Sequence, residues 1–191
     1  SDKIWFLSVA DATDSMAYWD GTTFTAISGT DQTTLNTLMG SSRGGGNLVV
    51  YKERIFIVPG DATEGRTTTT TRLIFTDPTP TAWNTPAVFQ ATNYVDVNFG
   101  DGQRLVDLAV YQDNLLLFKE DSSYMFTYSS SILEAQITKI NPFIGVKDRH
   151  CVATFEQSLY LLHEHSIYEI SNFNFTAINE KVIFETDENI P

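Results

Sequence analysis

The chain has 191 residues and a net charge of −12, with 12 Lys and Arg against 24 Asp and Glu. This balance disfavours nucleic-acid binding, which needs clustered Lys and Arg to neutralise phosphates. A single Cys excludes an internal disulfide framework, and no apolar run reaches the ~18 residues of a membrane span. An aromatic content of 13% favours β-structure.

The N-terminal part contains three short strand-like segments, at Ile4–Leu7, Ala17–Trp19 and Phe24–Ile27. Compared with the units that follow, this unit lacks a first strand. Either Val182–Phe184 supplies that strand and closes a ring, or residues outside this sequence supply it. The next segment, Asp31–Met39, is the only helix-like stretch, and its Thr-rich composition predicts at most one or two helical turns.

The rest of the chain repeats one pattern: four apolar residues, three polar residues, four apolar residues and three polar residues. The pattern occurs three times, and the first apolar run ends at Tyr51, Tyr111 and Phe155. Each occurrence predicts two apolar strands followed by two more polar strands. The expected strands are Leu48–Tyr51, Ile55–Val58, Leu73–Thr76 and Tyr94–Val97; Leu108–Tyr111, Leu115–Phe118, Tyr124–Tyr128 and Ala135–Ile140; and Val152–Phe155, Leu159–Leu162, Ile167–Ile170 and Phe175–Ile178.

Four-stranded antiparallel units that repeat every ~40–50 residues are typical of β-propeller blades. The sequence therefore predicts an all-β fold, a β-propeller or partial propeller of three to four blades in a single domain over residues 1–191. The expected blades cover residues 4–27 (incomplete), 48–97, 108–140 and 152–184. We expect Tyr51, Tyr111 and Phe155 to wedge between adjacent blades. The sequence starts at Ser and stops after DENIP, so we expect it to be part of a longer chain.

His163 and His165 are the weak candidates for a metal site, because imidazoles at i and i+2 share one side of a strand. However, His163–His165 falls at the turn position that Lys119–Asp121 and Pro59–Asp61 hold in the other units. A third and a fourth ligand are not visible nearby in the sequence. We therefore expect a solvated turn and no metal.

Other motifs that could carry chemistry have simpler structural explanations. His150-Cys151 could hold a thiol nucleophile. However, Cys151 lies at the start of the first, apolar strand of its unit, where a lone Cys usually packs as a small apolar residue. The glycine-rich Ser41–Asn47 lacks the features of a phosphate loop. Scattered carboxylates fall in predicted turns and form no acid/base pair: Asp11, Asp14, Asp101, Glu120 and Asp121. The sequence predicts no catalytic residues and no cofactor.

Two aspartate turns lie next to aromatic residues, in YWDGTTF (Tyr18–Phe24) and FTDPTPTAW (Phe75–Trp83). We expect β-turns fixed by Asp, in which an aromatic side chain folds back and packs against the turn as a plug. Trp19 and Trp83 would have structural roles. The motifs also resemble, imperfectly, the aspartate boxes of sialidase-type propellers. The alternative hypothesis is therefore a carbohydrate-directed propeller, either a receptor-binding module or a glycoside hydrolase.

Four longer segments, spread over about residues 47–172, resemble the β-propeller of bacteriophage tail proteins. They are NLVVYKERIFIV, RLIFTDPTPTAWN, DGQRLVDLAVYQDNLLLFKEDSSYMF and IGVKDRHCVATFEQSLYLLHEHSIYEI. The best-fitting members are the tail-nozzle and tail-hub proteins of short-tailed phages, in which six copies form the distal end of the tube. The resemblance implies a structural protein of the virion tail, a homo-oligomer such as a hexamer, and other tail proteins as partners. It implies no catalytic residues. The longer nozzle proteins add platform and nozzle domains, which this sequence does not show.

Overall fold

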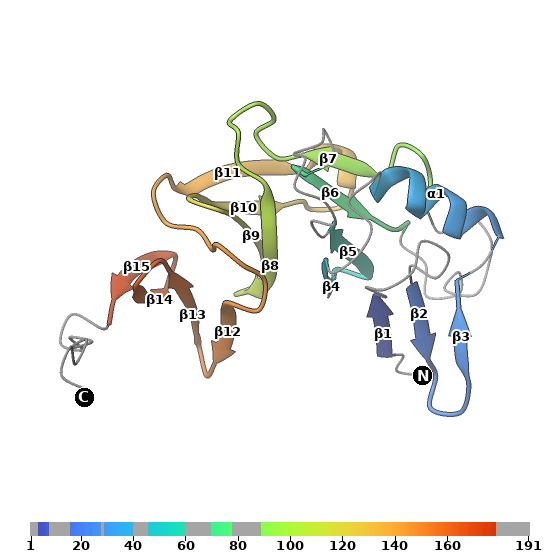
Figure 1. Cartoon of the computed structure of the whole chain (residues 1–191), viewed down its shortest axis with the longest axis horizontal. Coiled ribbons are helices and arrows are strands. Elements are labelled where there is room, and N and C mark those ends of the chain that lie inside the picture. Colours follow the sequence, from blue (N-terminus) through green and yellow to red (C-terminus); the bar gives the residue numbers. More distant parts are fainter. Residues whose placement is uncertain are drawn as a thin grey trace, which may run out of the picture.

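The computed structural model of the protein describes residues 4–7, 16–27, 29–39, 46–59, 70–77 and 89–178. In this part of the chain, four antiparallel sheets follow one another in sequence order. Figure 1 shows the sheets along an arc, with the first sheet near the N terminus and the fourth nearest the C terminus. The all-β class predicted from the sequence is confirmed.

Each sheet is a simple meander in which consecutive strands pair. The first sheet comprises β1 (Ile4–Leu7), β2 (Met16–Trp19) and β3 (Phe24–Ala26). The second comprises β4 (Asn47–Tyr51), β5 (Arg54–Val58), β6 (Arg72–Phe75) and β7 (Tyr94–Asp96). The third comprises β8 (Leu105–Tyr111), β9 (Asn114–Lys119), β10 (Ser123–Thr127) and β11 (Gln136–Asn141). The fourth comprises β12 (Val152–Phe155), β13 (Ser158–His163), β14 (Ser166–Ser171) and β15 (Asn174–Ala177). Each expected strand in the described residues has a counterpart within a few residues, whereas Val182–Phe184 lies outside them.

The sequence repeat produces sheets that are apolar on both faces. In β9, Leu115 and Leu117 pack into a cluster shared with the second sheet, while Leu116 and Phe118 pack into a cluster shared with the fourth. Successive side chains of a strand point to opposite faces, so a continuous apolar run supplies both contacts. The run of four apolar residues is therefore the signature of a strand between two neighbouring sheets.

The polar residues of the repeat form tight hairpin turns. The turns Lys52-Glu53 and Gln112-Asp113 join the first two strands of the second and third sheets, and both residues of each turn have a positive φ between 45° and 63°. Two-residue turns of this kind match the right-handed twist of the strands. The turn Asn172-Phe173 between β14 and β15 has the same conformation, with φ of 49° and 62°.

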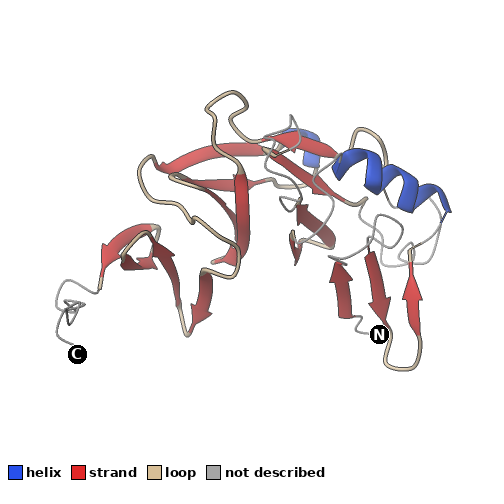
Figure 2. Ribbon diagram, in the orientation of Figure 1, coloured by secondary structure: helices blue, strands red, loops and turns tan. Residues whose placement is uncertain are grey.

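The segment expected to form at most one or two helical turns is an α-helix of 11 residues, α1 (Gly29–Met39), drawn in blue in Figure 2. Its Leu35, Leu38 and Met39 lie on one face and are buried with Met16 of β2 and with residues of the second sheet. Tertiary packing of this face outweighs the weak helix propensity of its Thr residues. The short-helix prediction was therefore wrong. No helix in the described residues is long and apolar enough to cross a membrane.

Candidate functional site

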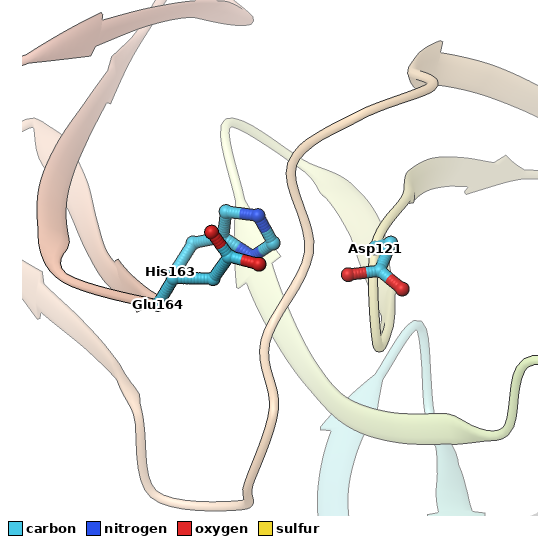
Figure 3. A group of neighbouring side chains, drawn as sticks. All are labelled: Asp121, His163 and Glu164. Atoms are coloured by element: carbon cyan, nitrogen blue, oxygen red, sulfur yellow. The ribbon is translucent and has the colours of Figure 1, made fainter.

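Three side chains that could ligate a metal meet where the third and fourth sheets adjoin. Asp121 lies in the turn between β9 and β10, while His163 ends β13 and Glu164 begins the following turn. Figure 3 shows the His163 and Glu164 side chains together on one turn and the Asp121 carboxylate on a separate turn of the neighbouring sheet. One ligand atom from each residue lies within 4.8 Å of the others. The sheet stacking thus brings together two turns that are far apart in sequence.

The expected pairing of His163 with His165 is not the one that the fold makes. His163 is only 8% exposed, whereas His165 lies in the exposed turn and does not belong to the cluster. The strand ends at His163, so the two imidazoles are not on one strand face. The expectation of a solvated turn was also wrong for His163, and Asp121 is the additional carboxylate that local sequence reasoning missed.

A buried lysine connects the second and third sheets. Lys119 is fully buried, and its Nζ donates hydrogen bonds to Asp101 Oδ1 at 2.6 Å, Val97 O at 2.9 Å and Asn98 O at 3.2 Å. Burial tends to raise the pKa of the Asp101 carboxyl, but hydrogen bonds from Lys119, the Gln103 amide and Asn98 together lower it. The Lys119 ammonium therefore helps to stabilise the ionised form of the Asp101 carboxyl.

A buried carboxylate connects the second sheet, the third sheet and the segment that leads into the fourth. Asp107 of β8 accepts hydrogen bonds from Asn47 Nδ2 of β4, from the Leu108 amide at 2.8 Å, and from the His150 amide at 3.2 Å. Asp107 is 1% exposed, and burial raises the pKa of its carboxyl despite these three hydrogen bonds. Because its donors come from the second sheet, from its own sheet and from the segment before β12, we assign Asp107 a structural role.

The three aromatic anchors, which are the residues that end the first strand of the second, third and fourth sheets, have two different environments. Tyr51 is buried between the second and third sheets, and its hydroxyl donates to Asp113 O at 2.9 Å. Tyr111 is buried between the third and fourth sheets, where its hydroxyl accepts the Asn172 amide at 3.0 Å. Phe155 is 63% exposed, so the expectation that it wedges between sheets was wrong for the described residues. Among these residues, nothing packs as a further sheet against the fourth.

The first aspartate turn forms as expected, without its aromatic plug. Asp20 Oδ1 accepts hydrogen bonds from the amides of Thr22 at 2.9 Å and Thr23 at 2.7 Å, which fixes the turn. Phe24 is 59% exposed, and Trp19 at the end of β2 is half-buried. In the second motif, Asp77 Oδ1 accepts from Asn93 Nδ2 at 3.0 Å. Trp83 lies outside the described residues.

A small pocket of about 280 Å³ opens between the β8–β9 turn of the third sheet and the β12–β13 turn of the fourth. It is lined by Val110, Tyr111, Gln112, Thr154, Glu156 and Gln157. Glu156 is the one ionisable carboxyl group in that lining, so the pocket offers no pair of carboxyl groups for glycosidic acid/base chemistry.

The remaining sequence candidates form no shared site in the described part of the chain. Cys151 is half-buried and packs with the cluster between the third and fourth sheets, as expected for a small apolar residue. His150 contributes its backbone amide to Asp107. Asp11, Asp14 and most of Ser41–Asn47 lie outside the described residues.

Comparison with known proteins found no family model that matches the chain and no matching curated protein.

Proposed function

We propose that this protein is a structural component of a bacteriophage tail, in which its sheets are blades of a β-propeller like those of tail-nozzle and tail-hub proteins. The observation that carries the proposal is the repeated burial of equivalent positions. Tyr51 and Val58 of the second sheet face the third, and Tyr111 and Phe118 of the third face the fourth. Stacking of this kind is the construction principle of propellers and other repeat folds.

The buried charged groups support a scaffold rather than an enzyme. Lys119 and Asp107 are 0% and 1% exposed. The three hydrogen bonds of Lys119 and two of the three made by Asp107 connect the third sheet to neighbouring segments. These bonds use the buried charges to hold one sheet to the next. The net charge of −12 also favours protein partners over nucleic acid.

The outer face of the fourth sheet is the contact through which a second copy of the chain adds to the array. Phe155, Leu162 and Ile167 make up this open face, with exposures of 63%, 45% and 40%. At the positions that correspond to Phe155 and Leu162 in the two preceding sheets, Tyr51, Val58, Tyr111 and Phe118 are at most 4% exposed. An apolar surface that continues two internal contacts is suited to another sheet of the same kind.

The polar residues on the open face are already satisfied within the sheet. Glu169 Oε1 accepts a hydrogen bond from Ser158 Oγ at 2.6 Å and one from the Tyr160 hydroxyl at 3.4 Å. A second copy can therefore cover the face without leaving this carboxylate unpaired. Self-association of this kind leads to the homo-oligomer that the tail resemblance implies, with other tail proteins as further partners.

The alternative is a carbohydrate-directed propeller, and one observation favours it. The 280 Å³ pocket combines Tyr111 with the polar side chains of Gln112, Thr154 and Gln157. Aromatic and amide groups of this kind suit sugar rings and hydroxyls. Its single carboxyl group makes a binding module more consistent than a hydrolase.

Immunogold labelling of phage particles tests the proposed function directly. Antibodies raised against the purified chain should label the tails of particles from the phage whose genome encodes it, and pre-immune serum should not. Mass spectrometry of the same purified particles should detect the chain. Tailed particles that carry neither label nor peptide would contradict the virion assignment. Saturable binding of the chain to a defined glycan, lost in Gln112→Ala, would in that case support the alternative.

A further inference from the structure

The His163 imidazole lies at the junction between the third and fourth sheets and has a nitrogen atom without a hydrogen-bond partner. The residue is 92% buried, since its exposure is 8%, and its Nδ1 is buried without a hydrogen-bond partner. Its ring lies 6.3 Å from that of Tyr168. An unsatisfied buried nitrogen is costly and uncommon in folded proteins. The position therefore needs a partner that the protein atoms do not provide.

The sequence repeat indicates what kind of partner is missing. His163 of β13 holds the position that Lys119 holds in β9, because each lies eight residues after its anchor, Phe155 or Tyr111. At the earlier junction, the Lys119 ammonium lies within hydrogen-bond distance of the Asp101 carboxylate and two backbone carbonyls. At this repeat position the third sheet has the Lys119 ammonium, whereas the fourth sheet has the shorter His163 imidazole, whose Nδ1 has no hydrogen-bond partner.

We propose that Asp121, His163 and Glu164 together bind one Zn²⁺ ion. The imidazole and the two carboxylates offer ligand atoms that all lie within 4.8 Å of one another. The cluster is drawn in Figure 3, with Asp121 on one turn and with His163 and Glu164 on the other. The ion takes the place that the ammonium of Lys119 has at the preceding junction, and it joins the third sheet to the fourth.

The donor set fits Zn²⁺ better than Ca²⁺ or Mg²⁺. Imidazole nitrogen combined with carboxylate oxygen is a usual zinc environment, whereas the two harder ions prefer all-oxygen sites. A tetrahedral ion with bonds of ~2.0–2.1 Å brings ligand atoms to ~3.4 Å from one another. Glu164 is exposed and can make this adjustment by rotating its side chain. Three protein ligands leave one position for water.

Lys147 competes with the ion for one of the ligands. Its Nζ forms an ion pair with Asp121 Oδ1, and the two side chains are 46% and 45% exposed. An ion pair this exposed contributes little stability, so a divalent ion can displace the ammonium into water. Removing the positive charge at residue 147 should therefore strengthen metal binding.

Isothermal titration calorimetry with ZnCl₂ tests this inference on the full 191-residue chain, after a chelator has removed any bound metal. The inference is independent of the proposed tail function. We expect one saturable site per chain and a rise in melting temperature on zinc addition. Asp121→Asn preserves the shape of the side chain and should weaken binding by at least ~10-fold. His163→Ala should abolish the site, and Lys147→Met should tighten it. Co²⁺ in place of Zn²⁺ should give the visible absorption of a tetrahedral site.

His165→Ala is the matched control, because His165 is the exposed neighbour outside the cluster. Its zinc affinity should equal that of the wild type. The absence of saturable binding to the folded wild-type chain would overturn the proposal. Binding that His165→Ala removes and Asp121→Asn leaves unchanged would also overturn it. Circular dichroism of each variant confirms that a loss of binding is not a loss of fold.

Discussion

Tyr111→Ala is expected to lower the free energy of unfolding by about 3–5 kcal/mol, the usual cost of truncating a buried aromatic residue. Tyr111 is 4% exposed and packs edge-on against Phe173, with ring centroids 5.6 Å apart. Its hydroxyl also accepts hydrogen bonds from the Asn172 amide and from Gln112 Nε2. The change therefore removes both apolar and polar contacts between the third and fourth sheets. Urea denaturation followed by tryptophan fluorescence measures the loss.

Phe155→Ala is the matched control, because Phe155 ends the first strand of the fourth sheet as Tyr111 ends that of the third. Its side chain is 63% exposed, so its loss should cost about 0.5 kcal/mol or less. The comparison is made at low protein concentration, where the chain is monomeric. Equal losses for the two variants would contradict the different environments of these equivalent positions.

Lys119→Met is expected to destabilise the protein by about 3–5 kcal/mol, as is typical when one partner of a buried ion pair is removed. Methionine fills a similar volume but removes the ammonium that neutralises the Asp101 carboxylate and donates to the carbonyls of Val97 and Asn98. Among the described residues, Asp101 keeps only its hydrogen bonds from the Gln103 amide and the Asn98 side chain. Thermal unfolding at neutral pH measures the effect. Lys147→Met is the control, because its ion pair with Asp121 is half-exposed and should contribute at most about 1 kcal/mol.

The Lys119 variant also has an expected pH signature. The pKa of Asp101 is lowered in the folded protein, so its ionised form contributes stability above the ordinary carboxyl pKa of ~3.9. That contribution is lost as the pH falls through the lowered pKa. The difference in the free energy of unfolding between wild type and Lys119→Met, here called the stability gap, should therefore be largest near neutral pH. It should become smaller toward pH 3. A gap that stays constant with pH would mean that Lys119 acts through packing alone.

The sheets could be predicted from the sequence because their physical cause is local. Alternating burial on two faces requires continuous apolar runs, and tight hairpins require polar turn residues at fixed spacing. Both features are present in Leu108–Lys119 and recur in the other units. The helix at Gly29–Met39 was underestimated because packing of Leu35, Leu38 and Met39, rather than propensity, stabilises it.

The candidate site could be predicted only in part, because it depends on contacts between sheets. His163 was identified as a weak metal candidate, but its carboxylate neighbour Asp121 comes from a turn 42 residues earlier. The equivalence of the two turns was visible in the repeat and is the signal that could have paired them. Burial of Lys119 had no such signal, because a lysine next to a predicted turn is normally solvated.

Phe155 shows the limit of inference from a repeat. The repeat correctly places Phe155 at the end of a first strand, but it does not reveal whether another sheet covers that strand. A residue's place within its sheet follows from the local pattern, whereas its burial depends on the neighbouring sheet. The exposure of Phe155 is therefore informative about assembly, and it is the basis for proposing a second copy as the partner.

Light scattering coupled to size-exclusion chromatography most directly tests the central claim, which is that the fourth sheet presents an unfilled position in a stack of sheets. The wild-type chain should form oligomers whose population increases with concentration. Phe155→Asp, which places a charge on the open face, should remain monomeric. Phe143→Asp changes a residue that is 80% exposed in the segment after β11 and should associate like the wild type. A wild-type chain that stays monomeric at high concentration, or association that Phe155→Asp leaves unchanged, would contradict the claim.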